Sequence, residues 1–501
     1  MVTVMGKRYL MRLGKTPFEL ADGFETLDRN TIGRNNGNLI FGTASHKLFS
    51  TEDTVVDANR YRINKSMAAR VNDEYDGFIL PLANAFRPGF EAELTRTAEF
   101  IEKLAIPFLM LSGGAQLPLD GDSAGLKRIE PAVKRFARAV LDKSSALTVR
   151  GELTAEYLKS LGFDDVLVVG CPSMTMNGRG HSVDKTASIE PGARIAYNLQ
   201  TSNPFGAELI DDAEAKYDAT YLPQDSATLE LMLWGTVPYR AVDDRLPLER
   251  THPQFAVGRA EFQLDAPSWI RRMSEMAFAF GPRIHGNIAA ILAGTPGIVL
   301  AHDGRTLELS KYHGIPAVDL AAEALPITVA ELYAKADFAE FNRGHAERFD
   351  RLSGFIHENG FTHIYDSGQE RARTEYEDRI ASTDYPPAQT TLWRDESSEF
   401  VRMAERLQLR YVAMKKELKE VEAQKSRTAA STGDDEVAWV LERLRDAERR
   451  LMKAESELEK VRGSVKSVRE KADRADRRVS SLLRLPLGVK NALGRRKRRE
   501  Q

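Results

Sequence analysis

The sequence predicts an α/β protein with two Rossmann-like domains and a C-terminal coiled coil. Short apolar segments alternate with amphipathic helical segments along most of the chain, which is typical of doubly wound parallel sheets. A polar segment without periodicity divides this series, and we interpret it as an interdomain linker. Near the C-terminus the apolar residues instead recur every seven residues, which indicates a coiled coil. We expect Rossmann-like domains at 1–185 and 192–340, a helical segment at 341–390, a coiled coil at 396–484 and a basic tail at 485–501.

Composition narrows the functional class. The chain has 501 residues, of which 42% are hydrophobic and 29% are charged, so it is long enough for two cores. A net charge of −2 gives no reason to expect a nucleic-acid partner. The single cysteine, Cys171, excludes a disulfide framework and a cysteine-based zinc site, and it suits a reducing compartment. No signal peptide is visible and no apolar run approaches the roughly 20 residues of a membrane span, so we expect a cytoplasmic protein.

The individual elements follow from the apolar segments and the turn residues between them. In the first domain the predicted strands are 39–42, 77–80, 107–111, 146–149 and 166–169, with helices at 91–104 and 129–141 and another that ends at 161. In the second domain the predicted strands are 194–199, 220–222, 239–242, 277–280, 297–300 and 317–320, with helices near 229–233 and 287–293. Right-handed crossovers between parallel strands are expected throughout.

The segment 276–316 carries the densest set of candidate functional residues. Arg283 and His285 follow one predicted strand, and Asp303 and Arg305 follow the next. In an open α/β sheet, ligands bind beyond the carboxyl ends of the strands. We therefore place the active site at this edge of the second domain.

The residue types in this segment suit an anionic ligand. Arg150 also follows a predicted strand, so Arg150 and Arg283 could bind a small ligand with two negative groups. His285 can donate or accept a proton near neutral pH. Asp303 and Arg305 either bind the ligand or pair with each other. No His, Cys or Asp cluster has metal-ligand spacing, so no metal is expected.

Three further loops offer backbone amides close to strand ends. A turn rich in Gly and Asn precedes the predicted strand 39–42, although an ordinary loop would have a similar composition. A second loop follows strand 77–80. The third contains two glycines but lacks the Lys and Ser/Thr of a P-loop. The candidate substrate-binding residues in these loops are Asn36, Gly37, Asn38, Asn84, Gly113 and Gly114.

Taken in order, these motifs resemble the polysaccharide pyruvyl transferase family over about residues 30–320. The resemblance rests on Asn36-Gly37-Asn38, Ser112-Gly113-Gly114, Leu147 to Thr154, Gly170-Cys171-Pro172-Ser173, Arg283-Ile284-His285, Ala290 to Pro296 and Asp303-Gly304-Arg305-Thr306. It implies a fold similar to the GT-B glycosyltransferases. It also implies transfer of a pyruvyl group from phosphoenolpyruvate to two hydroxyls of a cell-envelope sugar or its lipid-linked precursor, which forms a pyruvate ketal. Phosphoenolpyruvate is then the donor substrate, and no cofactor is implied.

The resemblance also suggests roles for single residues. It implies that His285 is the general acid and that Arg150 and Arg283 bind the phosphate and the carboxylate. Cys171 stands where many relatives have Asp, and the turn at 36–38 has amides where relatives have an acid, so the general base stays open. A glycosyltransferase that uses a nucleotide sugar and a non-catalytic coiled-coil scaffold are the alternative functions.

The heptad pattern in the C-terminal third predicts that this part of the chain packs against a partner helix. The heptad pattern consists of Val437, Leu444, Leu451, Leu458, Val465, Ala472 and Val479, with a second apolar set three residues after each. Such a seam needs a partner, which is either a second copy of the chain or the helical segment 407–421. The basic cluster 495–499 follows the apolar stretch 485–493 and predicts peripheral contact with an anionic membrane.

Overall fold

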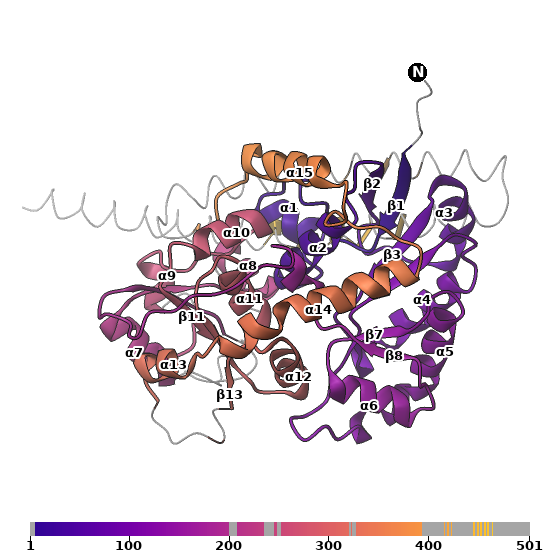
Figure 1. Cartoon of the computed structure of the whole chain (residues 1–501). Coiled ribbons are helices and arrows are strands. Elements are labelled where there is room, and N and C mark those ends of the chain that lie inside the picture. The colour runs from indigo at the N-terminus through magenta and orange to yellow at the C-terminus, as the bar shows by residue number, and fades with distance from the viewer. Residues whose placement is uncertain are drawn as a thin grey trace, which may run out of the picture. The chain divides into compact units, whose positions relative to one another are not determined.

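The structure is a computed structural model that separates into two compact units, residues 1–391 and residues 392–501. It describes residues 6–199, 208–234, 245–247, 252–319, 322 and 327–392, together with isolated helical positions between 415 and 463. Two parallel sheets, each flanked by helices, lie in the first unit (Figure 1). In the described part of the chain, no helix is both long and apolar enough to cross a membrane.

The first sheet has four parallel strands in the order β2-β1-β3-β5. Its strands are β1 (Lys7–Met11), β2 (Thr54–Ala58), β3 (Gly77–Pro81) and β5 (Phe108–Leu111). Successive side chains face opposite sides, so Phe78 and Leu80 enter one apolar core and Ile79 enters another. Two pairs of short strands extend the carboxyl edge: β4 (Asn84–Phe86) with β6 (Gly114–Ala115), and β7 (Leu147–Val149) with β8 (Val166–Val168).

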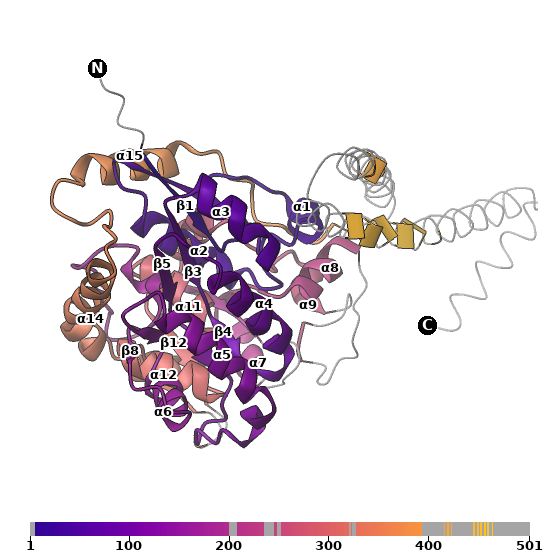
Figure 2. The same ribbon diagram turned by 90° about the vertical axis from the view of Figure 1, so that its right-hand side faces the viewer.

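Helices cover both faces of this sheet. Figure 2 shows α14 on one side of β3 and α4 and α5 on the other. One face packs on α3 (Ala68–Glu74), α4 (Glu91–Ile101), α5 (Glu130–Leu141) and α6 (Glu152–Ser160). The other face packs on the end of α2 (Gly37–Leu48) and on α14 (Ala339–Glu358). The remaining elements of this part are α1 (Gly23–Asp28), α15 (Glu370–Ser382) and the 3₁₀ turns η1 (Lys65–Met67), η2 (Pro88–Phe90), η3 (Ala124–Ile129) and η4 (Pro172–Thr175).

The second sheet has five parallel strands in the order β10-β9-β11-β12-β13. These are β9 (Arg194–Tyr197), β10 (Asp218–Tyr221), β11 (Phe278–Gly281), β12 (Gly297–Leu300) and β13 (Ala317–Val318). Its helices are α7 (Glu208–Lys216), α8 (Ser226–Trp234), α9 (Pro253–Ala256), α10 (Ala266–Met273), α11 (Ile284–Leu292), α12 (Gly304–His313) and α13 (Val329–Lys335). Every residue of α11 is buried, because it packs on the sheet and also on α2.

The prediction of an α/β fold with parallel sheets is confirmed, and one predicted strand is wrong. Residues 39–42 belong to α2, whose apolar positions are buried on nearly all sides between the two sheets. A short helix that is apolar all round has the same sequence pattern as a buried strand, which explains the error. The sequence analysis did not identify β1 and β2. Their charged and half-exposed residues hide the strand pattern.

Several predictions fall on residues that the structure does not describe. These are the strand at 239–242, most of the coiled coil and the basic tail. Within the heptad set, the described helical positions include Leu444 and Leu458, which are buried, and Leu451, which is partly exposed. The coiled coil and the membrane contact therefore stay predictions.

Buried polar contacts join the two α/β halves. Lys15, in the loop after β1, forms a salt bridge with Asp265, which precedes α10, and their side chains are 2% and 1% exposed. Asn36 at the start of α2 donates from Nδ2 to the carbonyl oxygen of Gln263 at 3.0 Å. These contacts hold the carboxyl edges of the two sheets against each other.

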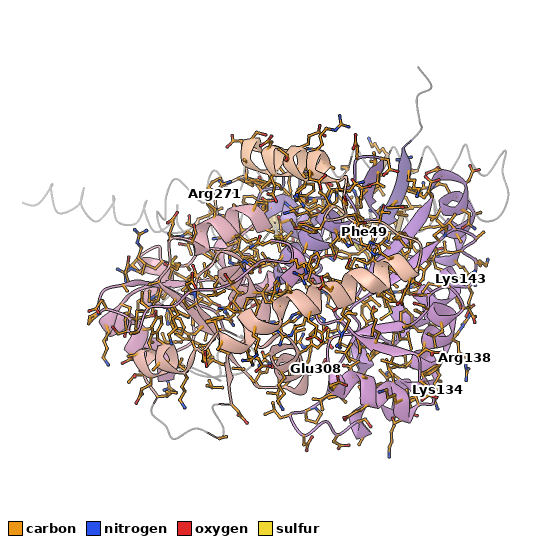
Figure 3. All side chains as sticks on the ribbon, in the orientation of Figure 1. Phe49, Lys134, Arg138, Lys143, Arg271 and Glu308 are labelled. Atoms are coloured by element: carbon orange, nitrogen blue, oxygen red, sulfur yellow. The ribbon has the colours of Figure 1, made fainter. Side chains whose placement is uncertain are left out.

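We expect Lys15→Ala to lower the free energy of unfolding by about 3–5 kcal/mol, because it leaves the Asp265 carboxylate buried without its cation. Chemical denaturation measures this change. The control is Lys134→Ala: Lys134 lies on the outer side of α5 (Figure 3), 4.0 Å from Glu130 and 38% exposed. That variant should lose less than about 1 kcal/mol. Equal losses in the two variants would show that the Lys15 salt bridge adds nothing specific.

Candidate active site

The candidate site is centred on the first turn of α11, directly after β11. Arg283 is the N-cap residue, and its backbone N–H donates to Asn198 Oδ1 at 2.7 Å. Its side-chain Nε donates to the carbonyl oxygen of Leu199 at 3.3 Å, and its Nη2 lies 3.7 Å from Asp225 Oδ2. His285 is the second residue of the helix and is 9% exposed. The predicted Arg-x-His motif therefore lies at the carboxyl end of a strand.

His285 faces the first α/β half. Its Nε2 is 3.7 Å from Cys171 Sγ. A Cβ atom at Gly37 would lie 2.8 Å from His285 Cβ, so the first residue of α2 must be glycine for this close approach. Burial lowers the pKa of His285 well below its usual value, and the charges of Arg150 and Arg305 lower it further. The imidazole is consequently uncharged at neutral pH.

Arg150 follows β7 and is almost fully buried, with 1% exposure. Its Nε donates to the carbonyl oxygen of Ser112 at 3.3 Å, and its guanidinium carbon lies 5.4 Å from the centre of the Phe41 ring. Its Nη2 is buried and has no hydrogen-bond partner among the described residues. A Cβ atom at Gly114 would lie 3.1 Å from Arg150 Cδ, so glycine leaves room for this side chain. A buried donor of this kind suits a ligand that brings the missing acceptor.

Asp303 and Arg305 begin α12 at the end of β12. Asp303 Oδ1 accepts hydrogen bonds from the backbone N–H and the hydroxyl of Thr306, both at 2.8 Å. Arg305 Nη2 donates to Asp303 Oδ2 at 3.4 Å. The two side chains therefore pair with each other, which is one of the two alternatives that the sequence left open. Asp303 therefore acts as a helix cap. Arg305 keeps a buried Nε without a partner among the described residues.

Glu308 is a residue of the site that the sequence analysis missed. It lies on α12 (Figure 3) and is 4% exposed. Its Oε2 accepts from the backbone N–H of Thr154 at 2.9 Å and its Oε1 from the Thr154 hydroxyl at 2.7 Å. Burial raises its pKa to about 7, although the bonds from Thr154 and the charge of Arg150 oppose the rise. In the sequence, Glu308 is marked only as a single acidic residue one helical turn after the Asp303-x-Arg305 motif.

Two of the predicted substrate-binding residues, Asn36 and Asn38, hydrogen-bond backbone carbonyls of the loops around them. Asn36 is fully buried and donates to a backbone carbonyl of the second half. Asn38 donates from Nδ2 to the carbonyl oxygen of Ile32 at 2.9 Å. Asn38 also lines a pocket beside Lys15 and Tyr61, away from the contacts of His285.

Asn84 and Gly113 stabilise the carboxyl edge of the first sheet. Asn84 pairs with Gly114 in the β4–β6 ladder and donates from Nδ2 to Gln116 Oε1 at 3.2 Å. Gly113 forms a parallel bridge with Val149, which joins the end of β5 to β7. Through these pairings the edge brings Arg150 next to Gly114.

Among the described residues, one cluster combines metal-ligand types: His357, His363 and Asp366. These side chains already hydrogen-bond one another, with His357 Nε2 2.9 Å from Asp366 Oδ1. His363 Nδ1 accepts from the backbone N–H of Tyr365 at 3.2 Å, so its proton lies on the other ring nitrogen. The cluster lies at the end of α14 and contributes nothing to the His285 site.

Known proteins with similar structures share little sequence with this chain. The UDP complex of Staphylococcus aureus MnaA is 10% identical, covers 70% of this chain and 96% of its own, and has a TM-score of 0.34. A UDP-GlcNAc 2-epimerase from Methanocaldococcus jannaschii, in complex with UDP-GlcNAc and UDP, is 9% identical, with 75% and 99% coverage and a TM-score of 0.32. No curated protein matches the sequence.

The sequence itself matches one family model, described as polysaccharide pyruvyl transferase, over residues 70–304. This range contains Gly114, Arg150, Cys171, Arg283 and His285. The resemblance seen in the motifs is thus confirmed, and residues 70–304 carry the sequence pattern of the polysaccharide pyruvyl transferase family.

Proposed function

We propose that this chain transfers a pyruvyl group from phosphoenolpyruvate to two hydroxyls of a cell-envelope sugar, with release of phosphate and formation of a ketal. The observation that carries the proposal is the buried Arg150 guanidinium, whose Nη2 has no acceptor among the described residues, near the imidazole of His285. The family match supports a transferase of this class.

The donor's charges fit the cations of the site. Phosphoenolpyruvate carries a phosphate and a carboxylate, and Arg150 and Arg305 each keep a buried N–H without an acceptor among the described residues. A guanidinium group binds either anion through two parallel hydrogen bonds. Arg283 is partly engaged by Leu199 and Asp225, so its role combines anion binding with positioning of α11.

His285 is proposed to protonate the methylene carbon of the donor. Its pKa is low because the imidazole is buried near two cations. A bound trianion offsets these positive charges, so it raises the pKa of His285 and favours the imidazolium. The proton then forms the new C–H bond. A sugar hydroxyl attacks the cationic carbon, the C–O bond to phosphate breaks, and a second hydroxyl closes the ketal. The two hydroxyl protons leave with the phosphate and the solvent.

Glu308 is proposed as a positioning residue. It joins α12, which carries Arg305, to the first turn of α6, which follows Arg150 directly. The spacing of the two arginines therefore depends on this carboxyl group. A Cβ atom at Gly151 would lie 2.6 Å from Glu308 Cβ, so the contact is also sterically tight.

We expect His285→Gln to reduce phosphate release from phosphoenolpyruvate by about 10²–10⁴-fold in the presence of envelope glycan fractions, since a general acid contributes that much. Donor affinity should change far less. The control is His357→Gln, because His357 is half exposed and lies outside the site. Phosphate release by a folded His285→Gln protein at the wild-type rate would exclude His285 as the acid. A wild-type protein that responds only to nucleotide sugars would favour the glycosyltransferase alternative.

Donor binding at neutral pH is expected to take up a proton from the buffer. His285 is uncharged before binding, and its pKa rises when an anion joins the two arginines, so protonation accompanies binding. Affinity for phosphoenolpyruvate should therefore increase as the pH falls from 8 to 6.5. Calorimetry in buffers of different ionisation enthalpy measures the proton number. The same number in His285→Gln would show that another group takes up the proton.

Arg150→Lys should weaken donor binding by about tenfold or more, because lysine keeps the charge but loses the planar fork. Calorimetric titration with phosphoenolpyruvate measures the affinity. The matched control is Arg179→Lys, an exposed arginine paired with Asp350 at 2.8 Å. Unchanged affinity in the folded Arg150→Lys protein would assign Arg150 a purely structural role.

A further inference from the structure

Two arginines outside the His285 site share one aromatic ring. The guanidinium carbon of Arg87 lies 5.2 Å from the centre of the Phe90 ring, and that of Arg12 lies 5.8 Å from the same centre. Arg12 follows β1 directly, and Arg87 follows β4 directly. Both therefore lie at the carboxyl edge of the first sheet, where α/β folds bind ligands.

Among the described residues no carboxylate forms an ion pair with Arg12 or Arg87, although the charge of Glu93 raises the pKa of Arg12. The Nε of Arg12 is buried without a hydrogen-bond partner in that part of the chain. Arg87 donates from Nε to the carbonyl oxygen of Asn84 at 2.9 Å. This hydrogen bond fixes the side chain and leaves its two terminal amino groups to bind a ligand. Two like charges held around one ring repel each other, and an anion bound between them would relieve this repulsion.

The backbone near Arg12 is strained. Arg60 and Tyr61 are consecutive non-glycine residues with φ of 57° and 56°. Such conformations are unfavourable for non-glycine residues and tend to occur at functional sites. The Tyr61 ring lies 4.9 Å from the Arg12 guanidinium carbon, so Arg12 contacts two rings.

This cation pair adjoins the donor site. Burial lowers the pKa of Arg87, and the charges of Arg305, Arg34 and Arg12 lower it further. The charge of Arg305 also lowers the pKa of His285. Arg305 therefore influences the pKa of both groups, so the cation pair and the donor site are electrostatically coupled.

We propose that Arg12 and Arg87 form a second phosphate site, which binds the diphosphate that joins the acceptor sugar to its carrier. Its assignment to the acceptor rests on the proposed function. Two arginine forks that form no ion pair with a carboxylate of the described residues suit a diphosphate, which offers several acceptor oxygens and more than one negative charge. The carrier is either a nucleoside or a polyprenyl lipid, since both present sugars on a diphosphate.

The test measures pyrophosphate binding by calorimetry, with and without saturating phosphoenolpyruvate. We expect pyrophosphate to bind in both conditions, because the two sites are separate. Arg87→Gln should weaken pyrophosphate binding by about tenfold, as expected for loss of charge-assisted hydrogen bonds, and should leave donor affinity within about threefold. Arg12→Gln should act in the same direction. Arg128→Gln, at an exposed residue that is 76% accessible, is the matched control and should change neither affinity.

The outcomes separate this site from the proposed function. Competition between pyrophosphate and phosphoenolpyruvate, or wild-type pyrophosphate affinity in Arg87→Gln and Arg12→Gln, overturns the second site and leaves the donor site intact. Pyrophosphate binding that depends on Arg87 in a protein that does not bind phosphoenolpyruvate supports the second site and refutes the donor. If Arg12→Gln fails to fold, the half-buried Arg87 decides alone, with Arg87→Lys expected to bind more tightly than Arg87→Gln. Farnesyl diphosphate and UDP-glucose then identify the carrier, and both must lose affinity in Arg87→Gln.

Discussion

A buried guanidinium that forms no ion pair with an acid of the described residues is the constraint on which the site depends. Arg150 is 1% exposed, and the imidazole of His285, which carries no charge at neutral pH, lies close enough for its pKa to respond to that cation. The acids of the site do not form hydrogen bonds with Arg150. Asp303 caps α12 through Oδ1 and pairs with Arg305 through Oδ2, and Glu308 accepts from Thr154. The fold thus keeps positive charge in a low dielectric, where an anion gains the most from binding.

Close packing between the two α/β halves creates this environment. Gly37 lets α2 approach His285, and Gly114 leaves space for Arg150. The helices α2 and α11 are buried against each other, so the first turn of α11 reaches the first half instead of water. Desolvation of His285 is therefore a consequence of interdomain packing. Any change that separates the halves would return its pKa towards the usual value.

Much of the fold was predictable because buried parallel strands are continuous apolar runs with polar residues at their ends. Such runs located β3, β5, β7, β11 and β12, and with them Arg150, Arg283 and His285. The pattern fails where an element is not simply buried. The strand β1 begins with exposed, charged residues, so the sequence analysis missed it together with Arg12. The helix α2 is apolar on all sides and was mistaken for a strand. Glu308 could not be identified from the sequence, because its position in the site depends on a hydrogen bond with Thr154, which is 154 residues away along the chain.

Arginines also lie at the carboxyl edge of the first sheet, where the sequence did not indicate them. Arg12 and Arg87 were not singled out in the sequence, since each follows an element that is short or charged. Their shared contact with Phe90 appears only when β1 and β4 come together at one edge. Arg305 belongs to the second half but influences the pKa of both Arg87 and His285. The positive charge at these strand ends therefore comes from both halves, and a change in one half alters the electrostatics of the other.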